Sequence, residues 1–440
     1  MSARALVALA ALAAASCAEL VGTDDVTFER STCGRGPAPC GDSGADLVVE
    51  TQNLFLYGLS EPYRAERRPH VEAALRASRA DVLCLTELGD PTDRDSILAA
   101  VASDLPYAYA PRTDANTPVS VPEDLRGNAP APPGPPLCEG LGMAAAAGLD
   151  CLAQHCSSIP GSGAGMLTDD DCAASHCDQS GLELPGKAER LCAQCLRALL
   201  DDHTIDATRG GCEAPPGDRP LGHSGDHATV LLSRHPLSRQ SLIVLPSTAA
   251  RQVLLVATVE KPGLPPVDVA CTRFTSNKEG AYDYYVGPYG GGADGLAAWD
   301  NEVLLQALRV SERLLAARPH VGVLMGWMGA SREVKVGGEV WVGGFRSEAL
   351  RVFDGGFVDA VSPTFTGCTA CLSNPLFDDT YVDRRPDQVF LLGLDRSRVV
   401  DVTVTNQEAV VPVTPGPRGK GASRAPISDH YGLRVGLRVR

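Results

Sequence analysis

The sequence has few aromatic side chains and no excess of positive charge. Its 440 residues include only 3 Trp, 10 Tyr and 9 Phe, and no aromatic residue lies between Tyr109 and Phe274. The 54 acidic residues outnumber the 39 basic ones, and the net charge of -15 opposes the phosphate field of nucleic acids. A hydrophobic fraction of 44% is still enough to bury a core. These features exclude a broadly basic nucleic-acid binder and predict a globular protein.

The first residues have the features of an export signal. Arg4 is followed by an apolar run over residues 5–15, and the letters AASC occupy positions 14–17. This pattern predicts a secretory signal peptide over residues 1–17. Small residues before a cysteine resemble the lipobox of bacterial lipoproteins, so Cys17 is the expected lipidation site.

The expected location is therefore the cell envelope, with the protein anchored to a bacterial membrane by lipid. The alternative is an ordinary cleavage site and a secreted protein. No later apolar run is long enough to predict a transmembrane helix, so the lipid is the only membrane attachment that we expect.

Composition divides the rest of the chain into a linker and one interrupted domain. Residues 18–45 carry Cys33 and Cys40 among Gly, Pro, Ser and Asp, which is typical of a linker with a small disulfide loop. Residues 46–440 are expected to form the domain, interrupted by a cysteine-rich insertion over residues 127–227 that holds eight cysteines and no aromatic residue. With so few large apolar side chains, this insertion is expected to depend on up to four disulfides.

A zinc site is the alternative for the insertion, because Cys192 and Cys195 have metal-ligand spacing. The histidines that could join them are His176, His203, His223 and His227. Export favours disulfides, since a thiolate site would have to survive oxidation.

The remaining cysteines follow from their surroundings. Cys368 and Cys371 are expected to form a disulfide, whereas Cys84 and Cys271 lie in apolar strands and are expected to be small buried thiols. The 15 cysteines then resolve into one acylated residue, two free thiols and up to six disulfides.

Apolar periodicity predicts alternating strands and helices. A strand over residues 47–55 is followed by a helix over 66–80 and a strand over 82–85, and the second half repeats this order with a helix over 304–315 and a strand over 321–325. Further strands are expected at 229–232, 252–259 and 267–271. The pattern predicts a layered α/β domain with large sheets.

Three short segments place polar residues at predicted strand ends. They read TQNLF at 51–55, ADVLCLTE at 80–87 and ISDH at 427–430. In this order and spacing they resemble the endonuclease/exonuclease/phosphatase family, the pancreatic-deoxyribonuclease-like metal-dependent phosphoesterases. LLSRHPL at 231–237 is similar to that family's central strand, and the resemblance covers the chain from about residue 47 to residue 439 outside the insertion. It implies a four-layered α/β sandwich, in which two central mixed sheets are flanked by helices.

The resemblance also implies a site for phosphoester hydrolysis, which needs a hard cation, a base for water and donors for the developing charge. Glu87 and Asp429 match the metal-site carboxylates, and Mg²⁺ is the implied ion, with Mn²⁺ or Ca²⁺ as substitutes. Asn53 matches the amide that helps to hold metal and phosphate. His430 matches the general base, and Asp387 matches the aspartate that orients this histidine.

Three positions depart from the family pattern. The chain reads GWMG at 326–329 where the family has Gly-Asp-Phe-Asn, so Trp327 and Gly329 supply neither the carboxylate nor the amide. CTRF at 271–274 stands where the family has Thr-His-Leu; Arg273 is expected to bind phosphate but cannot cycle a proton near neutral pH. Losing one transition-state contact costs about 2.7 to 4 kcal/mol, so the three changes together predict impaired catalysis.

A Gly-rich loop between Asn277 and Gly295 holds four of the ten tyrosines. Tyr282 and Tyr285 are the expected substrate contacts, because rings at the mouth of the site could stack on a sugar, a base or a lipid head group. A plain surface loop is the alternative.

The favoured function is an exported, lipid-anchored, phosphoesterase-like domain that is impaired in catalysis. One alternative is an active magnesium-dependent phosphodiesterase or nuclease whose site is compensated by neighbouring residues. Another is a non-catalytic module that binds an anionic ligand or a partner. The expected ligand is a phosphate ester or another anion, the net charge of -15 disfavours long nucleic acid, and the oligomeric state stays open.

Overall fold

The predicted site segments meet at one end of a six-stranded sheet. The computed structural model describes residues 44–56, 63–113, 227–247, 251–275, 289, 293, 295–316, 321–377, 382–413 and 422–440. The first sheet has the order β13-β16-β1-β2-β4-β3. Its strands are β1 (Leu47–Leu56), β2 (Val82–Leu88), β3 (Tyr107–Tyr109), β4 (Val230–Ser233), β13 (Val399–Thr405) and β16 (Gly432–Leu437). Since β1 is parallel to β2 and antiparallel to β16, the ends of β1 and β2 lie beside the start of β16.

A second six-stranded sheet has the order β11-β12-β8-β7-β6-β5. Its strands are β5 (Leu237–Val244), β6 (Val253–Val259), β7 (Val267–Arg273), β8 (Gly322–Trp327), β11 (Phe357–Asp359) and β12 (Asp387–Leu392). β7 and β8 are parallel, and their other neighbours are antiparallel, so this sheet is mixed like the first. Two small hairpin-like pairs join β9 (Val334–Val336) to β10 (Glu339–Val342) and β14 (Val411–Pro412) to β15 (Arg424–Ala425).

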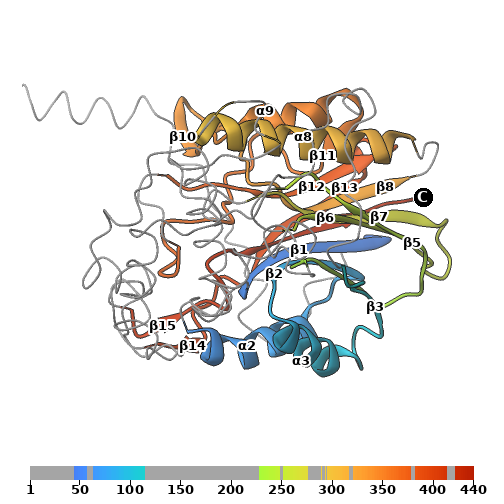
Figure 1. The fold of residues 1–440 in the computed structure, drawn as a ribbon, viewed down its shortest axis with the longest axis vertical. Coiled ribbons are helices and arrows are strands. Elements are labelled where there is room, and N and C mark those ends of the chain that lie inside the picture. Colours follow the sequence, from blue (N-terminus) through green and yellow to red (C-terminus); the bar gives the residue numbers. More distant parts are fainter. Residues whose placement is uncertain are drawn as a thin grey trace, which may run out of the picture. The chain divides into compact units, whose positions relative to one another are not determined.

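Helices cover the outer face of each sheet (Figure 1). α2 (Arg64–Ala77) and α3 (Pro91–Val101) pack on the first sheet, and α8 (Gly295–Ala316) packs on the second with α9 (Ser347–Arg351) beside it. Two short 3₁₀ turns, η4 (Val352–Gly355) and η5 (Arg396–Arg398), complete the described elements. This arrangement confirms the predicted four-layered sandwich. None of the helices in these residues has the length and apolar character that crossing a membrane requires.

Apolar side chains from both sheets fill the space between them. Val49 of β1, Val269 of β7 and Met325 of β8 are fully buried in this central layer. Alternate residues of the same strands point outward, so Leu54 packs with α2 and Leu324 packs with α8. Strands that are covered on both faces are expected to read as nearly continuous apolar runs, which is why β2 and β8 were recognisable in the sequence.

Helix α8 begins nine residues before the predicted start at residue 304, at Gly295. Its first turns bury Trp299 together with the polar residues Glu302 and Gln306. The polar pair is accommodated because Thr275 Oγ1 donates to Glu302 Oε1 at 2.7 Å and Thr275 N donates to Gln306 Oε1 at 2.9 Å. Two polar residues on the buried face interrupt the apolar periodicity, so the sequence pattern missed these turns.

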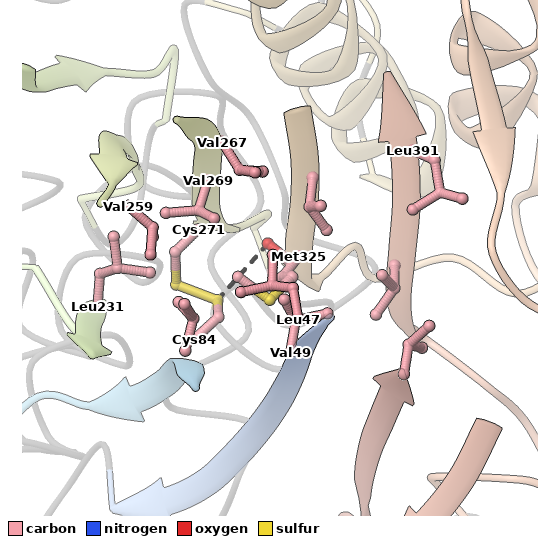
Figure 2. Close-up of a cluster of buried hydrophobic side chains, with 14 of the residues drawn as sticks. Leu47, Val49, Cys84, Leu231, Val259, Val267, Val269, Cys271, Met325 and Leu391 are labelled. Atoms are coloured by element: carbon pink, nitrogen blue, oxygen red, sulfur yellow. Dashed lines mark hydrogen bonds between the residues drawn. A yellow bond between two sulfur atoms is a disulfide. The ribbon is translucent and has the colours of Figure 1, made fainter. Parts of the chain in front are cut away.

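The prediction that Cys84 and Cys271 are free thiols was wrong. Their sulfur atoms are bonded, and the disulfide joins β2 of the first sheet to β7 of the second through the central layer (Figure 2). The two residues are 187 positions apart in the sequence and their Cα atoms are 5.3 Å apart. Each strand pattern correctly indicated burial, but neither could show that the two cysteines face each other. The predicted Cys368–Cys371 disulfide is confirmed.

We expect the Cys84→Ala/Cys271→Ala double variant to lower the free energy of unfolding by about 2 to 5 kcal/mol, because a cross-link over a long loop restricts the unfolded chain. Urea unfolding at equilibrium measures this change. The matched control is Cys368→Ala/Cys371→Ala, whose cross-link spans only 3 residues and should stabilise the protein less. A peptide map of unreduced protein that lacks the Cys84–Cys271 linkage would contradict the assignment.

Candidate functional site

The candidate site forms where the ends of strands from both sheets meet. Asn53 of β1 is opposite Thr86 of β2, one residue before Glu87. In the second sheet, Trp327 of β8 is opposite both Arg273 of β7 and Asp387 of β12. The Cys84–Cys271 disulfide fixes β2 and β7 a few residues before Glu87 and Arg273. Residues that are far apart in the sequence therefore converge on one buried region.

Two of the strand ends bend sharply at the site. Phe55 has a φ of 51° and Glu87 a φ of 56°, in the left-handed region that residues other than glycine rarely adopt. The β1–β2 register shifts between Asn53 and Leu56, and Asn53 Oδ1 accepts a hydrogen bond from Phe55 N at 2.9 Å. Such irregularities redirect side chains at the ends of strands. Here the irregular residues are Glu87 itself and Phe55, two residues after Asn53.

A buried arginine holds these strand ends together, and the sequence reading missed it. Arg67 of α2 is fully buried; its guanidinium donates to the carbonyls of Leu54 and Ile427, each at 3.0 Å, and to that of Phe55. It thereby joins the end of β1 to the segment that precedes His430. The sequence does indicate that Arg67 is buried, because it lies four and eight residues before Val71 and Leu75. At this spacing all three side chains lie on the buried face of α2.

Glu87 forms a buried ion pair with Arg273. Glu87 Oε1 accepts from Arg273 Nε at 3.2 Å and from Arg273 Nη2 at 3.1 Å, and the two side chains are only 11% and 3% exposed. Burial by itself would raise the pKa of Glu87, but the Arg273 guanidinium and then the charge of His430 lower it below its ordinary value. The carboxylate that the resemblance assigns to the metal is therefore ionised and neutralised by a cation of the chain itself.

Trp327 and Gly329 support this arginine as a packed unit. The Arg273 guanidinium carbon lies 5.4 Å from the centre of the Trp327 ring, a distance typical of a cation–π contact. Gly329 has a φ of +60°, and a Cβ there would lie 3.0 Å from the Trp327 ring. A glycine is also required at position 326, because a Cβ at that residue would lie 1.8 Å from Thr272 O. Of the three departures from the family pattern, Trp327 thus lies beside both of the others.

His430 and Asp387 form the hydrogen bond that the resemblance implied. His430 Nδ1 lies 2.8 Å from Asp387 Oδ2, and both side chains are buried. Burial by itself would lower the pKa of His430, but the carboxylates of Asp429 and Asp387 raise it to about 9. The imidazole is therefore positively charged at neutral pH. A charged imidazole donates protons and cannot accept one from water.

Aromatic rings flank His430. The ring centres of Trp327 and Phe377 lie 6.4 Å and 6.1 Å from that of His430, and both contacts are edge-to-face. Phe377 belongs to residues 368–377, a loop that begins with the Cys368–Cys371 disulfide. This arrangement confines the imidazole between an indole from β8 and a ring from a cross-linked loop.

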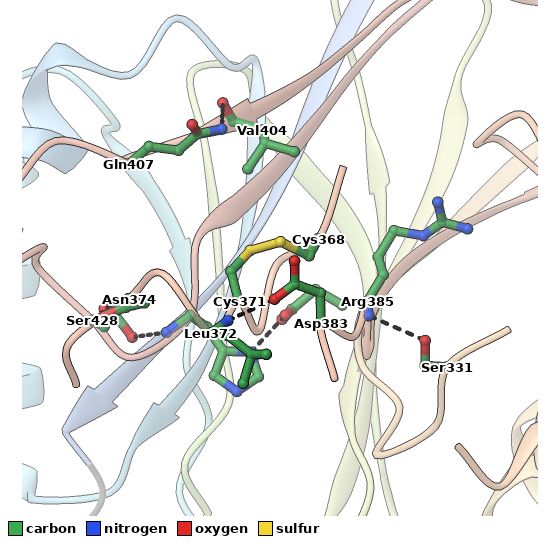
Figure 3. The surroundings of a disulfide bond; sticks show 12 residues. Ser331, Cys368, Cys371, Leu372, Asn374, Asp383, Arg385, Val404, Gln407 and Ser428 are labelled. Carbon is green, nitrogen blue, oxygen red and sulfur yellow. Dashed lines mark hydrogen bonds and ion pairs between the residues drawn. A yellow bond between two sulfur atoms is a disulfide. The ribbon is translucent and has the colours of Figure 1, made fainter. Parts of the chain in front are cut away.

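The disulfide loop also supports the backbone around His430. Asn374 Nδ2 donates to Ser428 O at 2.9 Å (Figure 3), and Tyr431 N donates to Thr369 O at 2.8 Å. Gln52 Nε2 donates to His430 O at 3.0 Å from the side of β1. The histidine is consequently fixed from two directions, although the disulfide loop attracted no functional interpretation from the sequence.

Not every predicted site residue is described by the structure. Cys17, Tyr282 and Tyr285 lie outside the described residues, as does all of the cysteine-rich insertion except His227. His227 is used structurally, because its Nε2 lies 2.7 Å from Pro111 O and its Nδ1 accepts from Thr229 N at 3.2 Å. Asp429 is buried next to His430, and Ser428 Oγ donates to its Oδ1 at 3.3 Å.

The residues present suit a cation held jointly with a ligand and not one held by protein groups alone. In the described part of the chain, no three His, Cys, Asp or Glu side chains are arranged to hold a metal ion. Asn53 Oδ1 is engaged by Phe55 N, and Glu87 is engaged by Arg273. The buried Asn53 Nδ2 lies close enough to influence the pKa of Glu87 but lacks a well-aligned hydrogen bond. Mg²⁺ is commonly bound by one or two carboxylates together with waters and substrate phosphates. Glu87 and Asp429 could supply the two carboxylates of such a site.

Several solved structures have a fold similar to that of this chain. No protein-family model and no curated protein sequence matches the chain. An endonuclease/exonuclease/phosphatase from Beutenbergia cavernae matches 90% of this chain and 72% of its own, with 16% identity and a TM-score of 0.44. Sphingomyelinase C from Streptomyces griseocarneus matches 89% of this chain and 99% of its own, with 14% identity and a TM-score of 0.47. A Staphylococcus aureus beta toxin mutant with bound magnesium ions matches 89% of this chain and 100% of its own, with 13% identity and a TM-score of 0.47.

We expect Gly329→Ala to destabilise the protein by about 1 to 3 kcal/mol more than Gly337→Ala does, because the added methyl group overpacks the Trp327 ring. Gly337 is a matched control, since its φ of +62° is close to the +60° of Gly329 and a Cβ there meets nothing within 4 Å. Chemical denaturation of both variants measures the difference. Equal losses would show that Gly329 is needed only for its backbone angle.

We expect the imidazole of His430 to titrate near pH 9 and the titration to move downward in Asp387→Asn, which removes the paired carboxylate. Because this pKa is raised above the ordinary value of 6.5, the stabilisation from the charged imidazole is complete below pH 6.5 and is lost as the pH rises through about 9. NMR titration of the histidine ring protons, with His430→Gln for assignment, measures the shift. The exposed Asp401→Asn variant is the control, and an unchanged midpoint in Asp387→Asn would contradict this pairing.

Proposed function

We propose that the protein is an exported, lipid-anchored domain with a phosphoesterase-like site that binds a phosphate ester or a related anion and is impaired in hydrolysis. The observation that carries this proposal is the buried ion pair of Arg273 with Glu87. It engages the carboxylate that would hold a catalytic metal and supplies a guanidinium suited to phosphate. Acylation of Cys17 and membrane attachment belong to this proposal on the sequence pattern alone.

Impaired hydrolysis follows from the chemistry of the side chains around the pair. Activation of the attacking water needs a bound cation, and the Glu87 carboxylate that would hold this cation is already paired with Arg273. Trp327 and Gly329 offer no carboxylate or amide for the attacking water or the developing charge. Each missing transition-state contact of this kind typically reduces the rate by about 100- to 1000-fold.

Phosphate recognition depends on the groups that remain. Arg273 can present a pair of parallel donors to phosphate oxygens. The charged imidazole of His430 and the amide of Asn53, whose Nδ2 lacks a well-aligned partner in the described structure, add further donors in the same region. A phosphate ester is favoured over long nucleic acid because the net charge of -15 repels an extended polyanion.

An active magnesium-dependent phosphodiesterase is the second candidate, and the hydrogen bond between Asp387 and His430 is the observation that favours it. Glu87 and Asp429 would hold the ion, which when bound polarises the phosphate and lowers the pKa of a bound water. Asp387 would then orient His430, and a cation near Glu87 would lower the pKa of the imidazole toward the range of a base.

Hydrolysis of phosphodiester and phosphomonoester reporters distinguishes the two candidates. We expect equal background rates from the wild-type protein and from Glu87→Ala and His430→Ala, with Mg²⁺ or with a chelator, together with saturable binding of phenyl phosphate in Mg²⁺. Asp95→Ala, on the exposed face of α3, is the control for preparation quality. A magnesium-dependent rate that is lost in either site variant would favour the active enzyme, whereas the absence of both turnover and binding would exclude a phosphate-ester site.

A further inference from the structure

Glu87 and Arg273 neutralise each other inside the protein, so neither charge can be withdrawn without consequence. Their side chains are 11% and 3% exposed, and two guanidinium nitrogens share one carboxylate oxygen. Removing one partner of a buried ion pair leaves an uncompensated charge, which is far more unfavourable than the pair is favourable. Any ligand that binds one member must therefore compensate the other.

The two ligands of a phosphoesterase-like site compete for this pair in complementary ways. A divalent cation needs the Glu87 carboxylate, and on binding it would leave the Arg273 guanidinium unpaired beside a dication. A phosphate ester needs the Arg273 donors, and on binding alone it would leave Glu87 ionised beside a dianion. When both ligands bind, Glu87 exchanges the guanidinium for the cation and Arg273 exchanges the carboxylate for the phosphate.

Two of the groups around the ion pair are already engaged in other contacts. The charge of Asp387 is already shared with His430, whose Nδ1 lies 2.8 Å from Asp387 Oδ2, although Asp387 Oδ1 has no hydrogen-bond partner among the described residues. The Trp327 ring lies 5.4 Å from the Arg273 guanidinium carbon and restricts its movement on that side. A rearranged single-ligand state would have to break these contacts as well as the ion pair.

We propose that the Arg273–Glu87 ion pair makes the binding of a divalent cation and of a phosphate ester mutually dependent, so that each ligand binds weakly without the other. This inference rests on the proposed phosphate-ester site. Thermodynamic linkage requires the two effects to be equal, and coupling between sites typically amounts to a change in affinity of about 5- to 150-fold. Arg273 is then the residue that couples the two ligands and does not simply fill the position of a lost histidine.

Isothermal titration of the full-length protein with phenyl phosphate and with Mg²⁺ tests the dependence. We expect Mg²⁺ to raise the affinity for phenyl phosphate by about 10- to 100-fold, and phenyl phosphate to raise the affinity for Mg²⁺ by the same factor. Titration of Mg²⁺ into phenyl phosphate without protein corrects for their association in solution. Equal affinity for phenyl phosphate in Mg²⁺ and in a chelator would overturn the inference and leave the proposed function intact.

Single substitutions distinguish coupled binding of the two ligands from independent binding. Glu87→Gln should bind phenyl phosphate more tightly than the wild type does in a chelator, because Arg273 is released, and Mg²⁺ should no longer improve this affinity. Arg273→Gln should bind Mg²⁺ more tightly than the wild type does in the absence of phosphate, because Glu87 is released. Weaker binding in both of these measurements would overturn the inference.

Two further variants keep the test informative if one of the single variants fails to fold. Arg273→Lys keeps the cation, so it should keep the dependence even if Arg273→Gln fails to fold. Arg112→Gln removes one partner of an exposed ion pair, 3.2 Å from Asp95, and should leave both affinities and their dependence unchanged. If no variant and no condition gives phenyl phosphate binding, the proposed function falls and this inference falls with it.

Discussion

Apolar contact between the two sheets determines where the polar side chains of the site can lie. Packed sheets are commonly about 10 Å apart, whereas the Cα atoms of Cys84 and Cys271 are 5.3 Å apart, so β2 and β7 approach closely at this point. The same strands continue to Glu87 and Arg273, whose side chains consequently meet without intervening groups. The ion pair between the sheets is thus a consequence of how the core beneath it packs, and the disulfide preserves that packing.

A carboxylate buried at the end of β2 requires a positive charge close by. A metal ion would supply that charge in proportion to its concentration, whereas Arg273 supplies it permanently. The arginine therefore stabilises the site in the absence of any ligand, and its contact with the Trp327 ring helps to hold the guanidinium in place. The cluster of Glu87, Arg273, Asp387 and His430 consists of paired opposite charges, which explains how so many ionisable groups can remain buried together.

The sequence was most informative where the pattern is local. Apolar patterning predicted the strands and a layered α/β domain, whereas the four-layered sandwich was implied by the family resemblance. The polar residues Asn53, Glu87 and His430 lie at the strand ends where the candidate site was expected. Asp387 was assigned beside His430 by resemblance, and the structure places the two groups 2.8 Å apart. Contacts between segments that lie far apart in the sequence could not be predicted. Three examples are the Cys84–Cys271 bond, the ion pair of Arg273 and the carbonyl contacts of Arg67. In each case the pattern of one segment does not indicate which other segment it contacts.

The contact between Trp327 and Gly329 also restricts how this sequence can evolve. A Cβ at position 329 would lie 3.0 Å from the indole, so any residue larger than glycine there requires the Trp327 ring to shift. An aspartate at position 327 would in turn withdraw the ring from Arg273 and bring a second carboxylate toward Glu87. Positions 327 and 329 therefore constrain each other, because a larger residue at 329 requires the indole at 327 to move. Substitutions at these two positions are consequently expected to change stability in a non-additive way.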